Sequence, residues 1–333
     1  MRKMILVLAC ALLLCGCADT PLALRPGPPA SFAPALARAF PLAVGVYAIG
    51  DRQRAKLGVE GEDETLQAVQ VGSGFMLDAS GTVATAAHVL EAATRVVVRL
   101  ADGRVLPAEV VGEDPATDIA VLHVAASLPQ APVFGRSTTL QPGDWVLAIG
   151  EPFGLNRSVA AGIVSGKDRH FVDDSEVIAI QSDIAFNPGN SGGPLLDARG
   201  AIVGMNQRSI LGPYGTPGVS LSAPIEVVQQ IAAELQRGPI RRPRLGAQFN
   251  DLTAPEALDA GRPDARGALV SQVERGSLAD RIGLRPDDIV VAMNGRPIAS
   301  GADLARALLA WREAAGTRLV VVRDKAYRQL VLP

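Results

Sequence analysis

From Pro41 onward the sequence is a succession of short apolar and β-branched runs divided by turn residues. Each run is shorter than a typical helix, and the 34 Gly and 24 Pro supply turns between them. We therefore expect a mainly β fold, an antiparallel barrel or sandwich. The runs are Ala43–Ile49, Gly74–Leu77, Thr82–Ala86, Arg95–Leu100, Ala108–Val111, Ile119–Val124, Trp145–Ile149, Val177–Gln181, Leu195–Leu196 and Ala201–Met205.

The sequence changes character after residue 238. Glu226–Leu235 has apolar residues at helical spacing and ends before a Gly-Pro pair, as a terminal helix should. A charged, Pro-containing stretch follows at 237–244, which predicts one domain at 41–238 and a second at 244–333. The second domain is expected to be α/β. Its predicted strands are Ala268–Val273, Ile289–Met293, Leu319–Arg323 and Arg328–Leu332, and its predicted helices are Leu278–Ile282 and Ala302–Trp311.

The N-terminus has the features of an export signal. Arg2 and Lys3 precede an apolar stretch, Met4–Leu14, which is too short to span a bilayer. The run LCGC (14–17) resembles a lipoprotein cleavage box, in which Cys17 becomes the acylated first residue. The alternative is ordinary cleavage near Cys17, which would release a soluble protein. We expect a signal peptide at 1–17 and a Pro-rich tether with an N-terminal segment at 18–40.

Composition excludes several classes of function. The formal net charge is −2, and no long basic run provides a surface for nucleic acid. All three cysteines lie within the first 17 residues, and the three histidines are scattered. No metal site and no organic cofactor is therefore expected.

Three side chains carry the candidate chemistry. Ser191 lies in the run GNSGGP (189–194), whose glycines let the backbone turn sharply and present N–H groups to a carbonyl oxygen. A serine nucleophile needs an imidazole to take its proton and a carboxylate to orient that imidazole. His88 and Asp118 are the candidates, although each, taken alone, has an ordinary structural explanation. His123 is expected to be a strand side chain, and His170 to lie in a polar loop.

The chain order His88, Asp118, Ser191 is that of chymotrypsin-like proteases, and the flanking sequence resembles the HtrA (Deg) family of ATP-independent bacterial serine proteases. The resemblance covers nearly the whole mature chain. It implies a chymotrypsin-like double β-barrel with His88 as general base, Asp118 as its orienting carboxylate, Ser191 as nucleophile, and an oxyanion hole at Gly189, Asn190 and Ser191. The matching runs are GSGFMLDASGTVATAAHVL (72–90), TDIAVLHV (117–124), GDWVLAIGEPFGL (143–155), SVAAGIVSG (158–166) and IQSDIAFNPGNSGGPLLDARGAIVGMN (180–206).

Asn190 replaces the aspartate that captures a newly cut N-terminus in pancreatic-type proteases. An amide cannot form that ion pair, so we expect activation by ordering of loops and not by zymogen cleavage.

The specificity pocket is expected to have a small, neutral base. Ala185 lies six residues before the nucleophile, where trypsin-like enzymes carry an aspartate, which predicts cleavage after Val or Ala. The pocket wall corresponds to residues 218–224. Leu221 stands where the family usually has an aromatic residue, between the hydroxyls of Ser220 and Ser222, so the side-chain preference stays open.

Further segments resemble regulatory parts of the family. Arg169 resembles a sensor-loop arginine that relays PDZ occupancy to the active site, although a solvated loop charge is an equal explanation. The insertion near residues 51–70 resembles the family's mobile loop. The C-terminal domain resembles a PDZ domain, in which backbone N–H groups of one loop bind a peptide C-terminus; a purely structural domain is the alternative. The corresponding loop is Arg244, Leu245, Gly246 and Ala247.

We therefore expect a PDZ-gated serine endopeptidase of the periplasm or cell envelope that acts on misfolded or regulatory proteins. A chaperone-like or peptide-binding protein with little turnover is the alternative. For an active protease, both broad degradation and a single regulatory cut agree with the sequence. The resemblance also implies a homotrimer. Phe32, Phe40 and Tyr47 are candidate interface aromatics, unless they pack on their own barrel.

Overall fold

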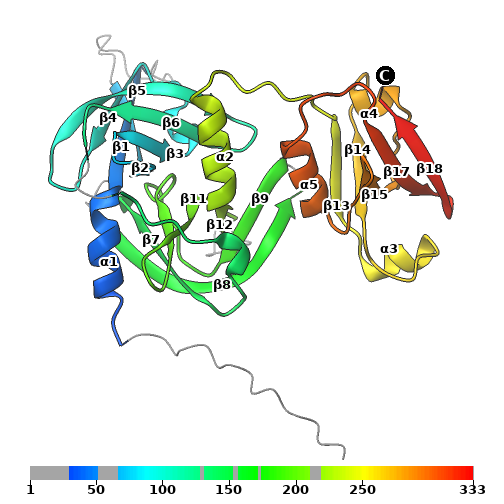
Figure 1. Ribbon diagram of the computed structural model, residues 1–333, viewed down its shortest axis with the longest axis horizontal. Helices are drawn as coiled ribbons and strands as arrows, with labels where there is room; N and C mark the ends of the chain where they lie inside the picture. The colour runs from blue at the N-terminus through cyan, green and yellow to red at the C-terminus, as the bar shows by residue number, and fades with distance from the viewer. Residues whose placement is uncertain are drawn as a thin grey trace, which may run out of the picture.

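The computed structural model describes residues 30–51, 67–127, 131–152, 157–171, 174–210 and 219–332. Over these residues the chain forms two closed β-barrels followed by a separate sheet with helices (Figure 1). The mainly β prediction is confirmed. Cys17, the predicted signal and tether up to residue 29, and most of the predicted loop near 51–70 lie outside the described residues.

The first barrel has the closed order β1-β2-β3-β6-β5-β4, with antiparallel neighbours throughout. Strand β4 alternates between outward and buried side chains, as the period of two of a strand requires. Strand β6 is buried along nearly its whole length, except for the outward-facing His123. The strands are β1 (Ala43–Asp51), β2 (Gln67–Met76), β3 (Thr82–Thr85), β4 (Arg95–Arg99), β5 (Val105–Asp114) and β6 (Ile119–Val124), and the 3-10 turn η2 (Ala87–Leu90) follows β3.

The second barrel has the closed order β10-β11-β12-β9-β8-β7. The sequence predicts no strand over Ser158–Phe171, yet β8 runs through all 14 of these residues. Its pairing with β9 shifts register three times, so a regular alternation of apolar residues is lost there. The elements are η3 (Ser137–Thr139), β7 (Trp145–Gly150), β8 (Ser158–Phe171), β9 (Asp174–Ser182), β10 (Pro194–Asp197), β11 (Ile202–Ile210) and β12 (Val219–Pro224).

Two helices cover the barrels. The helix predicted at Glu226–Leu235 is α2 (Ile225–Leu235), whose buried face contacts β5 and β6 of one barrel and β11 and β12 of the other. In Figure 1 it lies across the junction of the two barrels. A short helix that the sequence does not predict, α1 (Ala33–Ala39), precedes the first strand through the turn η1 (Phe40–Leu42). No helix among the described residues is long and apolar enough to span a bilayer.

The C-terminal sheet has the order β13-β14-β15-β17-β18, with β16 paired to β15, so β13 is an edge strand. The predicted strands and helices of this domain are confirmed to within two residues, while β13, β16 and α3 are additional. The elements are β13 (Ala247–Asp251), α3 (Ala254–Asp259), β14 (Ala268–Val273), α4 (Leu278–Arg281), β15 (Ile289–Met293), β16 (Arg296–Pro297), α5 (Gly301–Leu309), β17 (Arg318–Arg323) and β18 (Ala326–Val331).

Candidate active site

The predicted base and its carboxylate meet at the ends of two adjacent strands. His88 follows β3 and Asp118 precedes β6, and these strands pair with Thr85 opposite Ala120. The Nδ1 atom of His88 lies 3.0 and 2.9 Å from the two carboxylate oxygens of Asp118. The backbone N–H of His88 also donates to Asp118 Oδ1 at 2.9 Å. Because the carboxylate accepts the Nδ1 proton, the ring is oriented with Nε2 as its remaining basic atom.

This contact also tunes the imidazole. The hydrogen bond to Asp118 raises the pKa of His88, and it outweighs the opposing effect of burial. The negative charges of Asp118 and Glu91 raise the pKa further, while the positive charge of Arg208 lowers it. A base with a raised pKa accepts a proton more readily, provided that the pH leaves it uncharged beforehand.

Asp118 is held in a strained backbone conformation. Its φ is 55°, in the left-handed region that residues with a side chain adopt at a cost. A tight turn supports it: Thr117 N–H donates to Asp114 O at 3.1 Å, and Asp118 N–H to Pro115 O at 3.3 Å. The Thr117 hydroxyl donates to Asp114 Oδ2 at 2.6 Å. The turn from Asp114 to Asp118 therefore determines where the carboxylate that orients His88 lies.

Ser191 lies in a turn that packs closely against strands of both barrels. Gly192 has φ +85°, and a Cβ on it would lie 2.1 Å from Ser73 O and 2.5 Å from Thr85 Oγ1. A Cβ on Gly193 would lie 2.1 Å from a backbone oxygen of β7. Ser73 N–H donates to Ser191 O at 2.8 Å, which ties the turn to the first barrel. The two glycines are therefore needed for the serine to approach β3, the strand that leads into His88.

The hydroxyl of Ser191 donates to the backbone oxygen of Gln207 at 2.8 Å. Gln207 sits where the pairing of β11 with β12 slips between Asn206 and Arg208, so its peptide is displaced from the regular ladder. Its buried side-chain amide donates to Thr117 O at 2.7 Å, in the turn that carries Asp118. Gln207 thus contacts both the serine and the Asp118 turn, and no sequence pattern singled it out.

The predicted oxyanion-hole residues form a glycine-containing turn. Gly189 has φ +104°, and its oxygen accepts from Ser73 Oγ at 2.6 Å and from Glu151 N–H at 3.3 Å. Asn190 is buried, and its backbone N–H donates to Asn187 O at 3.0 Å. Within the described residues, the amides of Gly189 and Ser191 donate to no protein acceptor. These are the two N–H groups that the predicted oxyanion hole requires.

The predicted pocket residues lie on β12 and in the segment that follows β9. Ala185 is exposed, and it follows Ile184, whose oxygen accepts from Ser220 Oγ at 2.5 Å. Ser222 Oγ donates to Asn206 Oδ1 at 3.3 Å. Strand alternation sends Leu221, which is 1% exposed, to the opposite face of β12 from these two serines. The hydroxyls of Ser220 and Ser222 are thus engaged within the barrel.

The β8–β9 hairpin reaches the C-terminal domain through the neighbours of Arg169. Arg169 Nε donates to Gln181 Oε1 at 2.9 Å, within its own hairpin. Asp168 forms an ion pair with Arg306 of α5, and the ring of His170 stacks on Phe249 with centroids 4.5 Å apart. The Nε2–H of His170 donates to Phe249 O at 3.0 Å. The prediction of a polar loop at His170 is wrong: the residue belongs to β8, and its ring packs on another domain.

The predicted carboxylate-binding loop leads into the edge strand β13. Gly246 has φ +74°, and a Cβ there would lie 2.3 Å from Ser277 Cβ, so this position requires glycine. The backbone oxygens of Leu245 and Gly246 accept from Ala279 N–H and Glu274 N–H at 2.8 and 2.9 Å. Arg244 forms an exposed ion pair with Glu274. An edge strand preceded by such a loop can accept an added peptide strand.

Two of the candidate trimer aromatics make contacts within the chain. Phe32 packs on Trp145 with ring centroids 5.7 Å apart. Tyr47 Oη donates to Glu151 Oε2 at 2.7 Å, and Arg99 Nη2 donates to the same oxygen at 2.7 Å. Glu151 has no exposed side-chain surface, so it forms a buried polar junction between the barrels that the sequence did not reveal. Within the described residues, no cluster of His, Cys, Asp and Glu could hold a metal ion.

Two parts of the chain match named families. A family of trypsin-like peptidase domains matches residues 72–205, and a PDZ domain family matches residues 269–323. A probable periplasmic serine endoprotease, DegP-like, from Ectopseudomonas mendocina is 39% identical over 265 residues, which cover 79% of this chain and 56% of the relative. A relative with the same name from Hahella chejuensis is 40% identical, over 72% of this chain and 51% of its own length. The chain thus spans about half the length of these curated relatives.

Solved structures match over most of their length. An HtrA-type protease, AlgW, with a tripeptide is 31% identical, with a TM-score of 0.73, and the match covers 90% of this chain and 95% of that one. The same protease with a decapeptide is 30% identical, with a TM-score of 0.68, and 97% of its chain is covered. A serine endoprotease from Yersinia pestis matches at 27% identity with a TM-score of 0.63, over 91% of this chain and 96% of that one.

Proposed function

Because the chain belongs to the HtrA family of serine proteases, we propose that it is an ATP-independent serine endopeptidase of the periplasm. The observation that carries this proposal is the bidentate contact of Asp118 with His88 beside the turn of Ser191. The curated relatives are named periplasmic serine endoproteases, which supports both the activity and the location. The proposed substrates are misfolded or regulatory proteins of the cell envelope.

In the proposed mechanism, Ser191 Oγ attacks the scissile carbonyl carbon while His88 Nε2 takes the hydroxyl proton. Asp118 stabilises the imidazolium that forms, and the amides of Gly189 and Ser191 donate to the developing oxyanion. His88 then gives the proton to the leaving amine, and water hydrolyses the acyl-enzyme by the reverse sequence of proton transfers. The hydroxyl must first leave the oxygen of Gln207, which requires only rotation about the side-chain bond of Ser191.

The proposed specificity follows from Ala185. Its methyl group supplies neither charge nor bulk at the base of the pocket, so small aliphatic residues such as Val and Ala should bind before the cleaved bond. Sequencing the peptides released from unfolded casein tests this. Many cuts after Val or Ala favour broad degradation, and a single cut in one envelope protein favours a regulatory role.

We propose that C-terminal peptides bind along β13 and gate the protease. The β8–β9 hairpin contacts both α5 and β13, and Ile178 of this hairpin is 3% exposed within the apolar core of the PDZ domain. A peptide added beside β13 would therefore meet the contact between His170 and Phe249. Arg169 is the proposed relay, through its bond to Gln181 in the same hairpin.

Labelling with a fluorophosphonate probe tests the proposed activity. The probe is applied with and without peptide activators; wild-type protein should label at Ser191 under at least one of these conditions, and Ser191→Ala under neither. A wild-type protein that never labels would instead support the chaperone-like alternative, which holds unfolded chains with little turnover.

A trimeric assembly and a lipid anchor at Cys17 are also proposed, on the family resemblance and on the LCGC run. Intact-mass analysis of the mature protein measures acylation directly. Light scattering measures the assembly, and a monomeric mass would contradict the trimer.

A further inference from the structure

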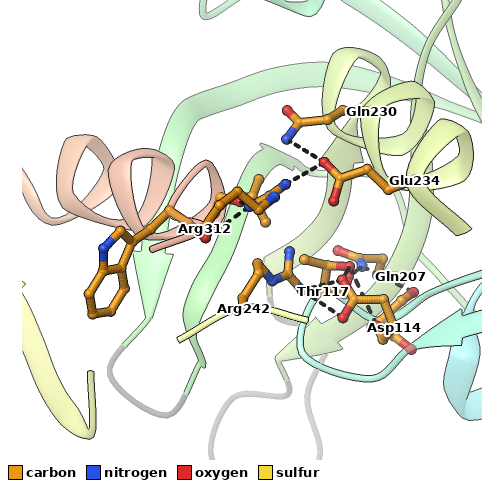
Figure 2. A network of polar contacts seen from close by, with 10 residues as sticks. Asp114, Thr117, Gln207, Gln230, Glu234, Arg242 and Arg312 are labelled. Carbon is orange, nitrogen blue, oxygen red and sulfur yellow. Dashed lines mark hydrogen bonds and ion pairs between the residues drawn. The ribbon is translucent and has the colours of Figure 1, made fainter. Parts of the chain in front are cut away.

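A buried arginine connects the segment between the domains to the turn that carries Asp118. Arg242 lies between the end of α2 at Leu235 and the start of β13 at Ala247. Its Nη2 donates to both carboxylate oxygens of Asp114, at 2.6 and 2.5 Å. The two side chains are 5% and 8% exposed. Figure 2 shows the guanidinium of Arg242 pointing to Asp114 beside Thr117 and Gln207.

Hydrogen bonds continue from this ion pair to the reacting groups. Asp114 Oδ2 also accepts from Thr117 Oγ1 at 2.6 Å, and Thr117 O accepts from Gln207 Nε2 at 2.7 Å. The oxygen of Gln207 in turn accepts the hydroxyl of Ser191. Thr117 directly precedes Asp118, so the same residues border the carboxylate that holds His88. Arg242 is thus separated from the triad by one short turn.

The charge of Arg242 matters because Asp114 is buried. A buried carboxylate without a cation moves toward water or takes up a proton, and either change disturbs the hydrogen bonds that it accepts. The bond affected here is the one that the Thr117 hydroxyl donates to Asp114 Oδ2, which closes the turn. The turn holds Asp118 at φ 55°, a conformation that persists only while its surroundings impose it.

We propose that Arg242 is a positioning residue for Asp118 and His88, and that it couples the PDZ domain to the catalytic site through the segment between the domains. This inference rests on the proposed protease function. The predicted peptide-binding loop begins at Arg244, two residues further along the chain. Two residues span at most about 7 Å, so a shift of this loop on peptide binding is transmitted to the guanidinium. This connection is separate from the β8–β9 hairpin.

The test compares Arg242→Gln with Arg312→Gln in the full-length protein. Arg312 follows α5 and pairs with Glu234 of α2, so it also joins the two domains, but it makes no contact with the turn from Asp114 to Asp118. The readouts are the melting temperature, the rate of fluorophosphonate labelling as a function of pH, and kcat and KM for a peptide substrate.

We expect Arg242→Gln to slow labelling at neutral pH by about tenfold, since a displacement of about 1 Å costs up to about 10²-fold. The fall should appear in kcat, with KM nearly unchanged. The acid limb of the labelling profile should move to lower pH, because a looser Asp118 no longer raises the pKa of His88. Arg242→Lys, which keeps the charge, should recover part of the rate, and Arg312→Gln should leave the rate and the profile unchanged.

A double variant serves as the control for unfolding of Arg242→Gln. Asp114→Asn combined with Arg242→Gln removes both buried charges together, which preserves folding better than removing one. It holds the turn by neutral hydrogen bonds only, so we expect it to melt near the wild type and still to label several-fold more slowly. If the folded double variant labels at the wild-type rate and with the wild-type pH profile, the inference is overturned. Failure of the wild type to label overturns the proposed function instead.

Discussion

Tyr47→Phe tests the buried polar junction between the barrels. The phenol donates to Glu151 Oε2 at 2.7 Å, and the carboxylate is fully buried. The change removes one oxygen atom and leaves the ring in place, so little apolar packing is lost. Glu151 keeps Arg99 on the same oxygen, which limits the cost.

The expected loss follows from the kind of bond. A hydrogen bond to a charged group contributes about 1.5–3 kcal/mol, and the acceptor left behind has no access to water. With Arg99 retained, we expect the free energy of unfolding to fall by about 2 kcal/mol. In a domain of this size each kcal/mol shifts the melting temperature by about 2–4 °C, so the transition of the protease domain should fall by about 4–8 °C.

Scanning calorimetry measures this fall, with Tyr327→Phe as the matched control. Tyr327 is 72% exposed on β18, and its substitution should change the melting temperature by less than about 1 °C. A Tyr47→Phe transition as close to the wild type as the control would refute the assignment of this bond as stabilising.

An alkaline titration gives a second, independent reading of the same contact. Burial and the bond to Glu151 raise the pKa of Tyr47 from 10.0 to about 12. Between these values the folded protein keeps a proton that the unfolded chain has lost, so stability falls as the pH rises. The advantage of the wild type over Tyr47→Phe should therefore be full below pH 10.0 and lost by about pH 12. An advantage that does not change through this range contradicts the contact.

Three further predictions concern the catalytic groups. Asp118→Asn should lower kcat for a peptide substrate by about 10³–10⁴-fold, because the amide holds His88 in the wrong tautomer; a loss below about tenfold contradicts the role of Asp118. Labelling of Ser191 should increase with pH through a midpoint above 6.5, since His88 must be uncharged and Asp118 raises its pKa; a midpoint at or below that value in a stopped-flow profile contradicts the geometry. Gly192→Ala should lower the free energy of unfolding, measured in urea, by about 3 kcal/mol and abolish labelling, because its Cβ would lie 2.1 Å from Ser73 O in a left-handed backbone. Labelling at the wild-type rate would contradict this close packing.

Much of the fold could be predicted because its strands are short, apolar and bounded by turns. β14 and β15 have the predicted bounds, and α2 differs by one residue. β8 escaped prediction because Gly166, Lys167 and Asp168 interrupt its apolar pattern, and its pairing with β9 slips at the same place. A bulged strand keeps its hydrogen bonds without keeping a period of two, so periodicity alone does not reveal it.

The candidate site likewise has residues that could be predicted from the sequence and residues that could not. His88, Asp118 and Ser191 are residue types with few substitutes in this chemistry, and their order along the chain was informative. Gln207, Thr117 and Arg242 act through backbone oxygens, a hydroxyl and an ion pair that exist only after the barrels close. Such residues have no characteristic sequence spacing, since their partners lie 90 and 128 positions away.

The single proton of the Ser191 hydroxyl has a consequence for control of the proposed protease. The hydroxyl donates to Gln207 O in this structure, so it cannot at the same time donate to His88. The His88–Asp118 pair is nevertheless already formed, with the carboxylate bound through both oxygens. Activation by way of these residues therefore needs no assembly of the acid–base pair, only a weaker hold of Gln207 on the serine. Because Gln207 also binds the turn that Arg242 stabilises, movement of that one turn affects both the serine and the group that orients its base.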